Sequence, residues 1–323
     1  MENRVTPYPL KCTPVLKTAL WGGRQLADSW RKAPPGESVA ESWELTVREH
    51  EQNVIQNGAL ADQTLNEVLS AHAEWIGTKH SGERFPLLIK FIDAEQTLSV
   101  QVHPDDDYAA RIECDSGKNE MWYIVDATPD AEIVYGLRDG VTVEEFRRAV
   151  AENRICDVLR FQPVRKGECY YIPAGLVHAI GAGILIAEIQ QNSDLTYRVY
   201  DYDRRGADGK LRELHRDKAC DVVVPMSEAE ICGKRYACRS SNEDVLAHSV
   251  YFCVSRCRVS AGEAVEGMVD EESFLHFLCL DGEAVIETPD ERIPMARGDS
   301  IFLPAGMGQY LVCGNAEWLS SRL

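Results

Sequence analysis

The sequence predicts a mainly β protein built from two copies of a jelly-roll β-barrel unit, with short helices inserted between the strands. Three observations support this fold class: many short runs typical of strands, two segments with helical spacing, and an internal repeat. The strand-like runs are rich in β-branched and aromatic residues and end at Gly, Pro or Asp. They cover residues 86–94, 98–104, 120–127, 131–137, 167–175 and 183–190.

Two segments favour helices within this β frame. Each combines the capping-box pattern, in which Thr is followed three residues later by Glu, with apolar residues at helical spacing. The segments are 62–77, capped by Asp62 or Thr64, and 142–160, capped by Thr142.

An internal repeat relates two parts of the chain. Residues 165–180 and 296–311 share a basic–Gly–acidic start, an aliphatic residue and the triplet Pro-Ala-Gly, at an offset of 131. Upstream, 120–127 aligns with 275–282 at an offset of 155. The difference of 24 residues (155 − 131) fits a helical insertion in the first copy, around 140–162.

The two copies differ in their polar residues. Glu120 aligns with Leu275 and His178 aligns with Gln309, so the second copy lacks equivalent metal-ligating side chains. We therefore expect the first copy to carry the chemistry. His276, beside Leu275, is expected to be a core residue rather than a ligand. The predicted domains are a catalytic, metal-binding domain with helical insertions at 1–240 and a degenerate domain at 241–323, with a polar linker at 239–244.

The charge balance limits the partners. The chain has 34 basic and 52 acidic residues, a net charge of −18, so we expect neither nucleic acid nor anionic membrane as a partner. The chain contains no run of 18 apolar residues, so no membrane span is expected. Pro and Lys interrupt the N-terminal segment, so no signal peptide is expected. The eleven cysteines include no Cys-x-x-Cys pair and are expected to be buried thiols of a cytoplasmic protein.

Polar residues of the first copy could converge on a metal. In the run that ends in Val-His-Pro, side chains alternate across the strand, so Ser99, Gln101 and His103 share one face. Taken alone, such a face could simply meet water at a sheet edge. Glu120 and His178 belong to the repeat and would add a carboxylate and a second imidazole.

The spacing Gly167-x5-Pro173-x-Gly175-x2-His178 resembles the second signature of the cupin superfamily. In the cupin barrel this signature and an upstream one meet inside. Two imidazoles, one carboxylate and one amide suit a divalent metal, and catalytic zinc takes about three protein ligands and keeps an open position. Two histidines with a carboxylate also suit ferrous iron, so the ligands leave the metal open.

Segments spread over nearly the whole chain carry a closer resemblance. The most specific is FPLLIKFIDAEQTLSVQVHPDD at 85–106; the others are 21–26, 41–46, 117–127, 170–204 and the C-terminal repeat. Through them the chain resembles the type I phosphomannose isomerases, in particular their short bacterial branch.

The resemblance implies an aldose–ketose isomerase that interconverts mannose 6-phosphate and fructose 6-phosphate through an enediol or enediolate. It implies one zinc ion per chain in the first barrel, held by Gln101, His103, Glu120 and His178. It also implies that Arg198 is essential for the reaction. Without the resemblance, Arg198 could equally well serve only the fold, through an ion pair with Asp201 or Asp203.

Phosphate binding is implied for Ser99, Lys118 and Arg204, the last standing where longer members carry lysine. The acid–base residue stays open among Glu188, Asp194, Lys118 and a metal-bound water.

The expected partner is a small sugar phosphate, and the protein is expected to be a monomer or a homodimer. Two other function classes share the ligands. One is a different metal-dependent cupin enzyme, such as an iron-dependent oxygenase or an isomerase of another phosphosugar. The other is a non-catalytic sugar-binding cupin with a structural metal.

Overall fold

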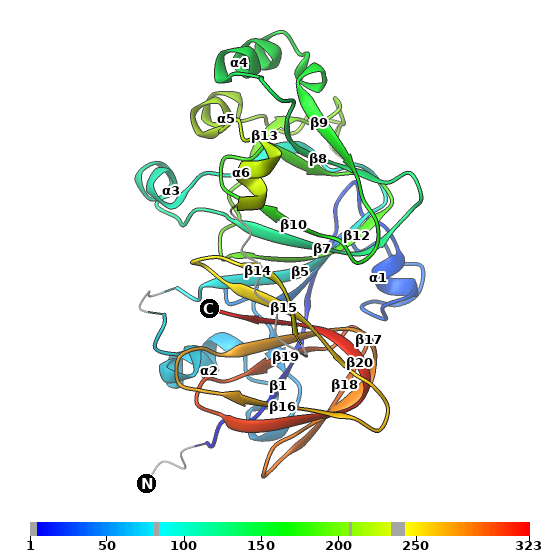
Figure 1. Ribbon diagram of the computed structural model, residues 1–323, viewed down its shortest axis with the longest axis vertical. Helices are drawn as coiled ribbons and strands as arrows, with labels where there is room; N and C mark the ends of the chain where they lie inside the picture. Colours follow the sequence, from blue (N-terminus) through cyan, green and yellow to red (C-terminus); the bar gives the residue numbers. More distant parts are fainter. Residues whose placement is uncertain (1–4, 81–83, 207–208, 234–242) are drawn as a thin grey trace.

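Three β-sheets stack along the long axis of the molecule (Figure 1). The structure is a computed structural model and describes residues 5–80, 84–206, 209–233 and 243–323. The five-stranded sheet lies at the top, the six-stranded sheet in the middle and the nine-stranded sheet at the bottom of Figure 1. The prediction of a mainly β chain with two jelly-roll units is confirmed, although each unit is an open, curled sandwich rather than a closed barrel.

The first copy is formed by the five- and six-stranded sheets. In spatial order, the six-stranded sheet contains β10 (Cys169–Ile172), β7 (Glu120–Ala127), β12 (Ile184–Gln191), β5 (Leu87–Ala94), β3 (Glu41–Leu45) and β2 (Val15–Lys17). The five-stranded sheet contains β13 (Tyr197–Tyr200), β6 (Val100–Val102), β11 (His178–Ile180), β8 (Glu132–Leu137) and β9 (Leu159–Pro163). All six runs predicted from the sequence contain a strand.

The nine-stranded sheet forms the second copy. Its order is β14 (Glu243–His248), β15 (Cys253–Val259), β20 (Gly308–Arg322), β17 (Leu275–Glu287), β19 (Ser300–Leu303), β1 (Leu10–Thr13) and β4 (Val54–Ile55), with β16 (Ala264–Val269) on β20 and β18 (Arg292–Ala296) on β17.

Strands from both ends of the chain share the nine-stranded sheet, because β1 pairs with β19. The division between 1–240 and 241–323 therefore stays a prediction. Within the expected linker at 239–244, residues 239–242 lie outside the described residues, and β14 begins at Glu243.

The internal repeat extends to strand register. Glu120 pairs with Ile172 in the first copy, and Leu275 pairs with Leu303 in the second. These pairs are related by the offsets of 155 and 131 read from the sequence, so β7 and β10 are the equivalents of β17 and β19. The repeat is confirmed, and Glu120 and Leu275 occupy equivalent positions.

Both predicted helices form, with the predicted caps. Thr64 and Thr142 make capping boxes at the starts of α2 (Leu65–Ala71) and α4 (Val143–Ala151). Both predicted segments are too long. The first, 62–77, divides after Ala71 into α2 and a separate 3₁₀ helix at Ala73–Ile76. The second, 142–160, ends early because Asn153 adopts the left-handed region at φ 54° and stops α4. The chain then continues through η3 (Ile155–Asp157) into β9. The other helices are α1 (Gln25–Asp28), α3 (Asp106–Glu113), α5 (Arg216–Val222), α6 (Glu228–Gly233), η1 (Gly58–Leu60) and η2 (Ala73–Ile76).

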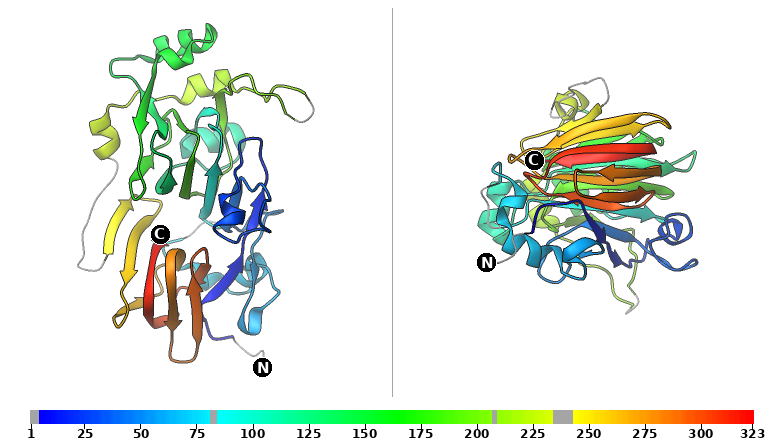
Figure 2. Two further views of the ribbon diagram at one scale, coloured as in Figure 1. Left: turned by 90° about the vertical axis from the view of Figure 1, so that its right-hand side faces the viewer. Right: turned by 90° about the horizontal axis from the view of Figure 1, so that it is seen from below.

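The six-stranded sheet is buried on both faces, and this position determines where the polar residues of β7 point. Met121 and Tyr123 pack into the apolar layer shared with the nine-stranded sheet, whereas Trp122 and Ile124 face the interior of the first copy. Because strand side chains alternate, Glu120 shares the inner face with Trp122. The side view in Figure 2 shows the two copies stacked end to end around this arrangement.

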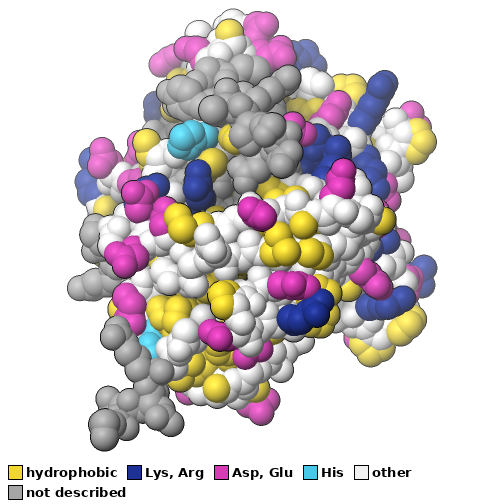
Figure 3. All heavy atoms as spheres, turned by 60° about the horizontal axis from the view of Figure 1, so that its bottom comes forward, with side chains coloured by type: hydrophobic (Ala, Val, Ile, Leu, Met, Phe, Trp, Pro, Cys, Tyr) yellow, Lys and Arg dark blue, Asp and Glu magenta, His cyan; other side chains and the backbone are white. Residues whose placement is uncertain are grey.

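Acidic side chains are spread over the face drawn in Figure 3, in keeping with the net charge of −18. Apolar side chains lie among them in small separate groups. No helix in the described ranges is long and apolar enough to cross a membrane. Cys12, Cys114, Cys156, Cys220, Cys279 and Cys313 are free thiols. Cys114 and Cys156 are exposed and Cys220, Cys253 and Cys313 are only half-buried, so the expectation of buried thiols is wrong for these five.

Candidate active site

Two histidines and one glutamate meet inside the first jelly roll. His103 Nε2 lies 3.1 Å from His178 Nε2 and 3.1 Å from Glu120 Oε1. His178 Nε2 lies 4.0 Å from Glu120 Oε2. All three side chains are buried, and one donor atom from each lies within 4.8 Å of the others. The first copy therefore brings together three residues that are separated by up to 75 positions in the sequence.

This donor set fits a metal ion. Ligand atoms bound about 2.1 Å from a tetrahedral zinc lie about 3.4 Å apart, close to the separations found here. The Nδ1–H of His178 donates to the carbonyl of Leu176 at 2.8 Å, which leaves the lone pair of Nε2 directed at Glu120 and His103. A hydrogen bond of this kind fixes the tautomer that a metal requires.

The charge states also suit a cation. Burial and the charge of Lys118 lower the pKa of His103 to about 3, and burial lowers the pKa of His178. Both imidazoles are therefore neutral near pH 7. Burial alone would raise the pKa of Glu120, but Lys118 and His103 together outweigh it and hold that pKa well below its usual range. Two neutral imidazoles and a carboxylate result.

Gln101 lies beside this cluster on β6. Its Nε2 is 3.3 Å from His178 Nε2, and Gln101 is the strand-register partner of His178. Turning the amide by 180° presents its oxygen to the same place. Gln101 is only half-buried, so it stands on the open side of the cluster.

A buried polar network continues from the cluster across the six-stranded sheet. Lys118 Nζ lies 3.0 Å from Glu120 Oε1. The indole Nε1 of Trp122 donates to Glu120 at 2.9 Å and to Glu188 at 2.7 Å. Lys90 Nζ is 3.0 Å from the other oxygen of Glu188. Lys90 and Trp122 are not among the residues predicted for the site; a lone lysine within the apolar run 86–94 was the available signal for Lys90.

Burial and the charge of Glu120 raise the pKa of Glu188 to about 7, against the opposing charge of Lys90. Burial would lower the pKa of Lys90, but Glu188 and Glu41 raise it above its usual value. The network thus contains a carboxyl group that is half ionised near neutral pH, beside a firmly charged ammonium group.

Arg198 lies on the opposite wall, in β13. Arg198 is the strand-register partner of Gln101 on β6, and its Nε donates to Ser99 Oγ at 3.2 Å. Its Nη1 donates to the carbonyl of Glu213 at 2.9 Å. Asp201, which the sequence offered as an alternative partner, instead pairs with Arg204 and Arg212.

The remaining predicted residues are placed less centrally. Asp194 pairs with Arg48 at 3.5 Å, and its side chain is 53% exposed. Arg204 Nη1 donates to the carbonyl of Thr97 at 2.6 Å. His276 is fully buried in the second copy, where its Nε2 lies 2.8 Å from Ser300 Oγ, consistent with the core role expected for it.

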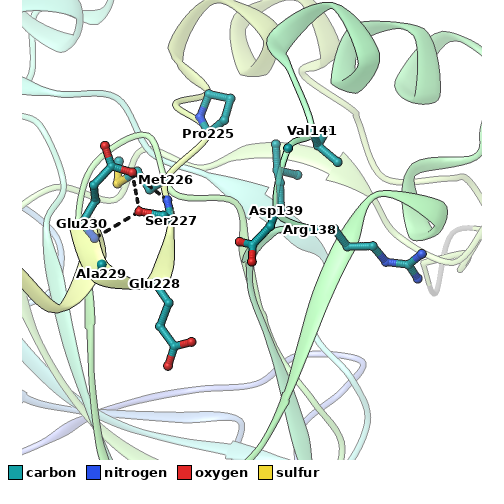
Figure 4. Close-up of a pocket in the computed structure, with 11 residues that line it drawn as sticks. Arg138, Asp139, Val141, Pro225, Met226, Ser227, Glu228, Ala229 and Glu230 are labelled. Atoms are coloured by element: carbon teal, nitrogen blue, oxygen red, sulfur yellow. Dashed lines mark hydrogen bonds between the residues drawn. The ribbon is translucent and has the colours of Figure 1, made fainter.

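A separate groove of about 780 Å³ opens between residues 137–141 and 225–230 (Figure 4). Ser227 Oγ donates to Glu230 Oε2 at 2.7 Å and accepts from the Glu230 backbone N–H at 3.3 Å, which caps the start of α6. None of the predicted site residues lines this groove, so its size does not mark the chemistry.

Fold and site together define a two-copy cupin protein with a candidate metal site inside its first copy. A family model of the type I phosphomannose isomerase catalytic domain matches residues 9–148, and a model of the mannose-6-phosphate isomerase cupin domain matches residues 242–323. The chain belongs to the type I phosphomannose isomerase family.

Full-length relatives agree with this assignment. Mannose-6-phosphate isomerase ManA of Bacillus subtilis is 39% identical over 99% of this chain and 100% of its own length. Mannose-6-phosphate isomerase of Streptococcus mutans is 33% identical over 97% of this chain and 98% of its own. The solved structure of the mannose 6-phosphate isomerase from Bacillus subtilis matches with a TM-score of 0.89 at 34% identity, covering 98% of this chain and 99% of that one.

Proposed function

We propose that the protein interconverts mannose 6-phosphate and fructose 6-phosphate. The observation that carries this proposal is the buried cluster of His103, Glu120 and His178, in a chain whose family and full-length relatives are isomerases of this kind. Further polar groups adjoin the cluster, since Lys118 and the indole N–H of Trp122 contact Glu120, and this suits an open-chain sugar.

The proposed cofactor is one zinc ion per chain, held by Gln101, His103, Glu120 and His178. Neutral imidazoles and an ionised carboxylate are the forms that bind zinc. When bound, zinc would supply a Lewis acid that polarises the sugar carbonyl and orients the two oxygens at C1 and C2.

The reaction needs a proton carrier in the same pocket. A base takes the proton from C2 of the aldehyde form, and the electron pair moves to form the C1–C2 double bond of an enediolate. Return of that proton to C1, with transfer of the O2 proton to O1, gives the ketone. The carrier is most effective when its pKa lies near the working pH.

Among the proposed proton carriers, Glu188 has the environment that best suits this role. Its carboxyl is buried and has a pKa of about 7; one oxygen accepts a hydrogen bond from Trp122, and the other lies 3.0 Å from the Lys90 ammonium group. Lys118 lies against Glu120, where its ammonium group can stabilise negative charge on the reacting oxygens. Asp194 remains a third candidate at the exposed edge.

Arg198 is proposed to stabilise charge that develops during the reaction. Ser99, Lys118 and Arg204 are the proposed phosphate-binding residues, and the hydrogen bond between Arg198 and Ser99 joins the two groups. The 1–240 segment is the proposed catalytic domain, with 241–323 as its degenerate partner. The free thiols of Cys114 and Cys156, which are exposed, favour a cytoplasmic protein. The proposed active form is a monomer or a homodimer.

A coupled assay tests the proposal. Purified protein is stripped with a chelator and reloaded with zinc or with ferrous iron, and fructose 6-phosphate formed from mannose 6-phosphate is measured. We expect no turnover after stripping and recovery with zinc. A fully metal-loaded protein that does not turn over mannose 6-phosphate would contradict the isomerase proposal, and recovery with iron alone would contradict the zinc proposal.

A further inference from the structure

Asp201 is a buried carboxylate that holds two arginine side chains. Arg212 approaches it with two nitrogens, Nε to Oδ2 at 2.6 Å and Nη2 to Oδ1. Arg204 Nη2 donates to the same Oδ1 at 2.5 Å. Asp201 is 5% exposed, and although burial would raise its pKa, the hydrogen bonds from Arg212 and Arg204 lower it, so the carboxylate is ionised near pH 7.

The two arginines differ in how many of their donors are used. Arg204 has all three nitrogens in hydrogen bonds, to Asp201 and to the carbonyl of Thr97. It therefore links the turn after β13 to the segment that precedes Ser99. Arg212 uses only Nε and Nη2, both for Asp201, and among the described residues its Nη1 has no hydrogen-bond partner.

Arg198 is the third guanidinium of this group. Its Nε and Nη1 are used by Ser99 and Glu213, which leaves Nη2 without a partner in the described part of the chain. After burial, the charge of Arg212 is the largest influence that lowers the pKa of Arg198, ahead of the opposing charge of Asp201. Arg198 also lies beside the segment that carries Arg212, because its Nη1 donates to the carbonyl of Glu213, the next residue.

Three guanidinium groups and one buried carboxylate leave two positive charges in excess. The other nearby carboxylates, on Asp203 and Glu213, belong to exposed residues, so water screens them. Holding like charges together is unfavourable without an anion, and a phosphate monoester carries about two negative charges near pH 7. A single guanidinium group can bind two phosphate oxygens through two parallel hydrogen bonds.

We propose that Arg212 is a phosphate-binding residue, which acts with Arg198 and Ser99 on the phosphate of the sugar substrate. Asp201 is its positioning residue, because its carboxylate fixes two of the three guanidinium nitrogens of Arg212. The inference rests on the proposed function and extends it to a residue that neither the strand pattern nor the cupin signatures mark. Arg212 reaches the site because a hairpin closed by the bridge between Arg205 and Leu211 returns the chain to Asp201.

Arg212→Gln is the first test, with Arg205→Gln as the matched control. Arg205 is an exposed arginine of the same hairpin, and its Nη1 donates to the carbonyl of Gly209 at 2.8 Å. In phosphate-free buffer, KM for mannose 6-phosphate and the inhibition constant of inorganic phosphate are measured for each variant. A charged hydrogen-bond pair contributes about 1.5–3 kcal/mol, so Arg212→Gln should raise both constants roughly 10- to 100-fold, with a much smaller fall in kcat. Arg205→Gln should change each constant less than about twofold.

An unchanged phosphate inhibition constant in Arg212→Gln would overturn the proposal, as would an equal rise in Arg205→Gln. A fall in kcat alone would assign Arg212 to the chemical step instead. If wild type does not turn over mannose 6-phosphate, the proposed function fails, but direct calorimetry with inorganic phosphate still tests the anion site.

A second pair of variants tests the role of Asp201. Asp201→Asn keeps the shape of the side chain and removes its charge, so Arg212 loses its orientation and the phosphate inhibition constant should rise several-fold. In Arg212→Gln/Asp201→Asn, the rise should equal that of Arg212→Gln alone, because the residues act as one unit. Additive effects would contradict the positioning role. If Asp201→Asn does not fold, Arg212→Lys, which keeps the charge and loses the two-pronged contact, should recover only part of the phosphate binding.

Discussion

Glu188 and Trp122 face each other on neighbouring strands, and one indole N–H links two carboxylates of the site. The pair is in register between β12 and β7, and Trp122 Nε1 lies 2.7 Å from Glu188 and 2.9 Å from Glu120. A carboxyl with a pKa of about 7 is thereby joined to one that is firmly ionised. The proposed proton carrier, Glu188, and the proposed metal ligand, Glu120, therefore accept hydrogen bonds from the same indole N–H.

Trp122→Phe should move the acid limb of the pH–activity profile to higher pH. Phenylalanine has no N–H, so the ionised form of Glu188 loses a donor and its pKa rises further above about 7. The limb is measured as kcat/KM for mannose 6-phosphate between pH 5.5 and pH 8.5. Loss of the buried ring volume and of the hydrogen bonds should also lower the free energy of unfolding by roughly 2–4 kcal/mol.

Trp43→Phe is the matched control for Trp122→Phe. Trp43 Nε1 donates to Glu41 at 2.7 Å, the same Glu-x-Trp arrangement on β3. Because Glu41 reaches Glu188 only through Lys90, this variant should lose stability and move the acid limb much less than Trp122→Phe does. Superimposable pH profiles for Trp122→Phe and wild type would contradict the link between Trp122 and the proton carrier.

Glu120→Gln should weaken metal binding. A neutral amide replaces an anionic ligand between His103 and His178, and even changes to residues behind the ligands cost 10- to 100-fold in affinity, so we expect a loss of at least about 100-fold. Metal content after dialysis against a weak chelator, determined by mass spectrometry, reports the change. Glu132→Gln, at an exposed position of β8, should retain the wild-type content. Full occupancy in Glu120→Gln would remove Glu120 from the ligand set.

The repeat could be predicted because it is a local pattern, whereas the cluster was predicted from strand alternation together with the resemblance to the cupins and to the isomerase family. A strand with alternating polarity places Gln101 and His103 on one face whatever surrounds it, and the offsets of the repeat anticipate the pairing of Glu120 with Ile172. Register in a sheet buried on both faces is strongly constrained, because a slip of one residue would turn Glu120 into the apolar layer.

Contacts between distant segments could not be predicted in this way. The pairing of β1 with β19 joins residues nearly 300 positions apart, and nothing in the short β1 sequence specifies that partner. Lys90 was missed because an apolar run conceals a single charge whose partners come from other strands. The excess length predicted for α4 has a local cause, since apolar spacing continued to Leu159 while Asn153 adopted a left-handed backbone.

Arg198→Ala should reduce turnover by about 10²–10³-fold while the fold and the metal content stay intact. The side chain contacts Ser99 and a backbone carbonyl but is not one of the candidate ligands, so its removal leaves the metal donors in place. Turnover, circular dichroism and metal analysis are measured on the same preparation. Near-normal turnover in a folded, metal-loaded variant would exclude Arg198 from the mechanism.

His276 should make the protein less stable in mild acid. Ser300 Oγ donates to the carbonyl of Glu44 at 2.6 Å, so it must accept from His276 Nε2–H, and His276 Nδ1 has no partner among the described residues. Burial and the charge of Lys32 lower the pKa of His276 to about 3, from 6.5. Between these values the unfolded chain binds a proton that the folded chain does not, so this contribution to stability is present above pH 6.5 and is lost as the pH falls toward 3.

His276→Gln removes this titration and leaves Glu44, Lys32 and every other group in place. The loss for wild type from His276 alone is about 1.4 kcal/mol per pH unit, so the advantage of wild type over the variant should shrink by roughly 2 kcal/mol between pH 6.5 and pH 5. Urea unfolding at several pH values measures the difference, in which the contributions of the shared groups cancel. Parallel curves for the two proteins would mean that His276 takes up a proton in the folded state as readily as in the unfolded chain, through a rearrangement that gives its Nδ1 a partner.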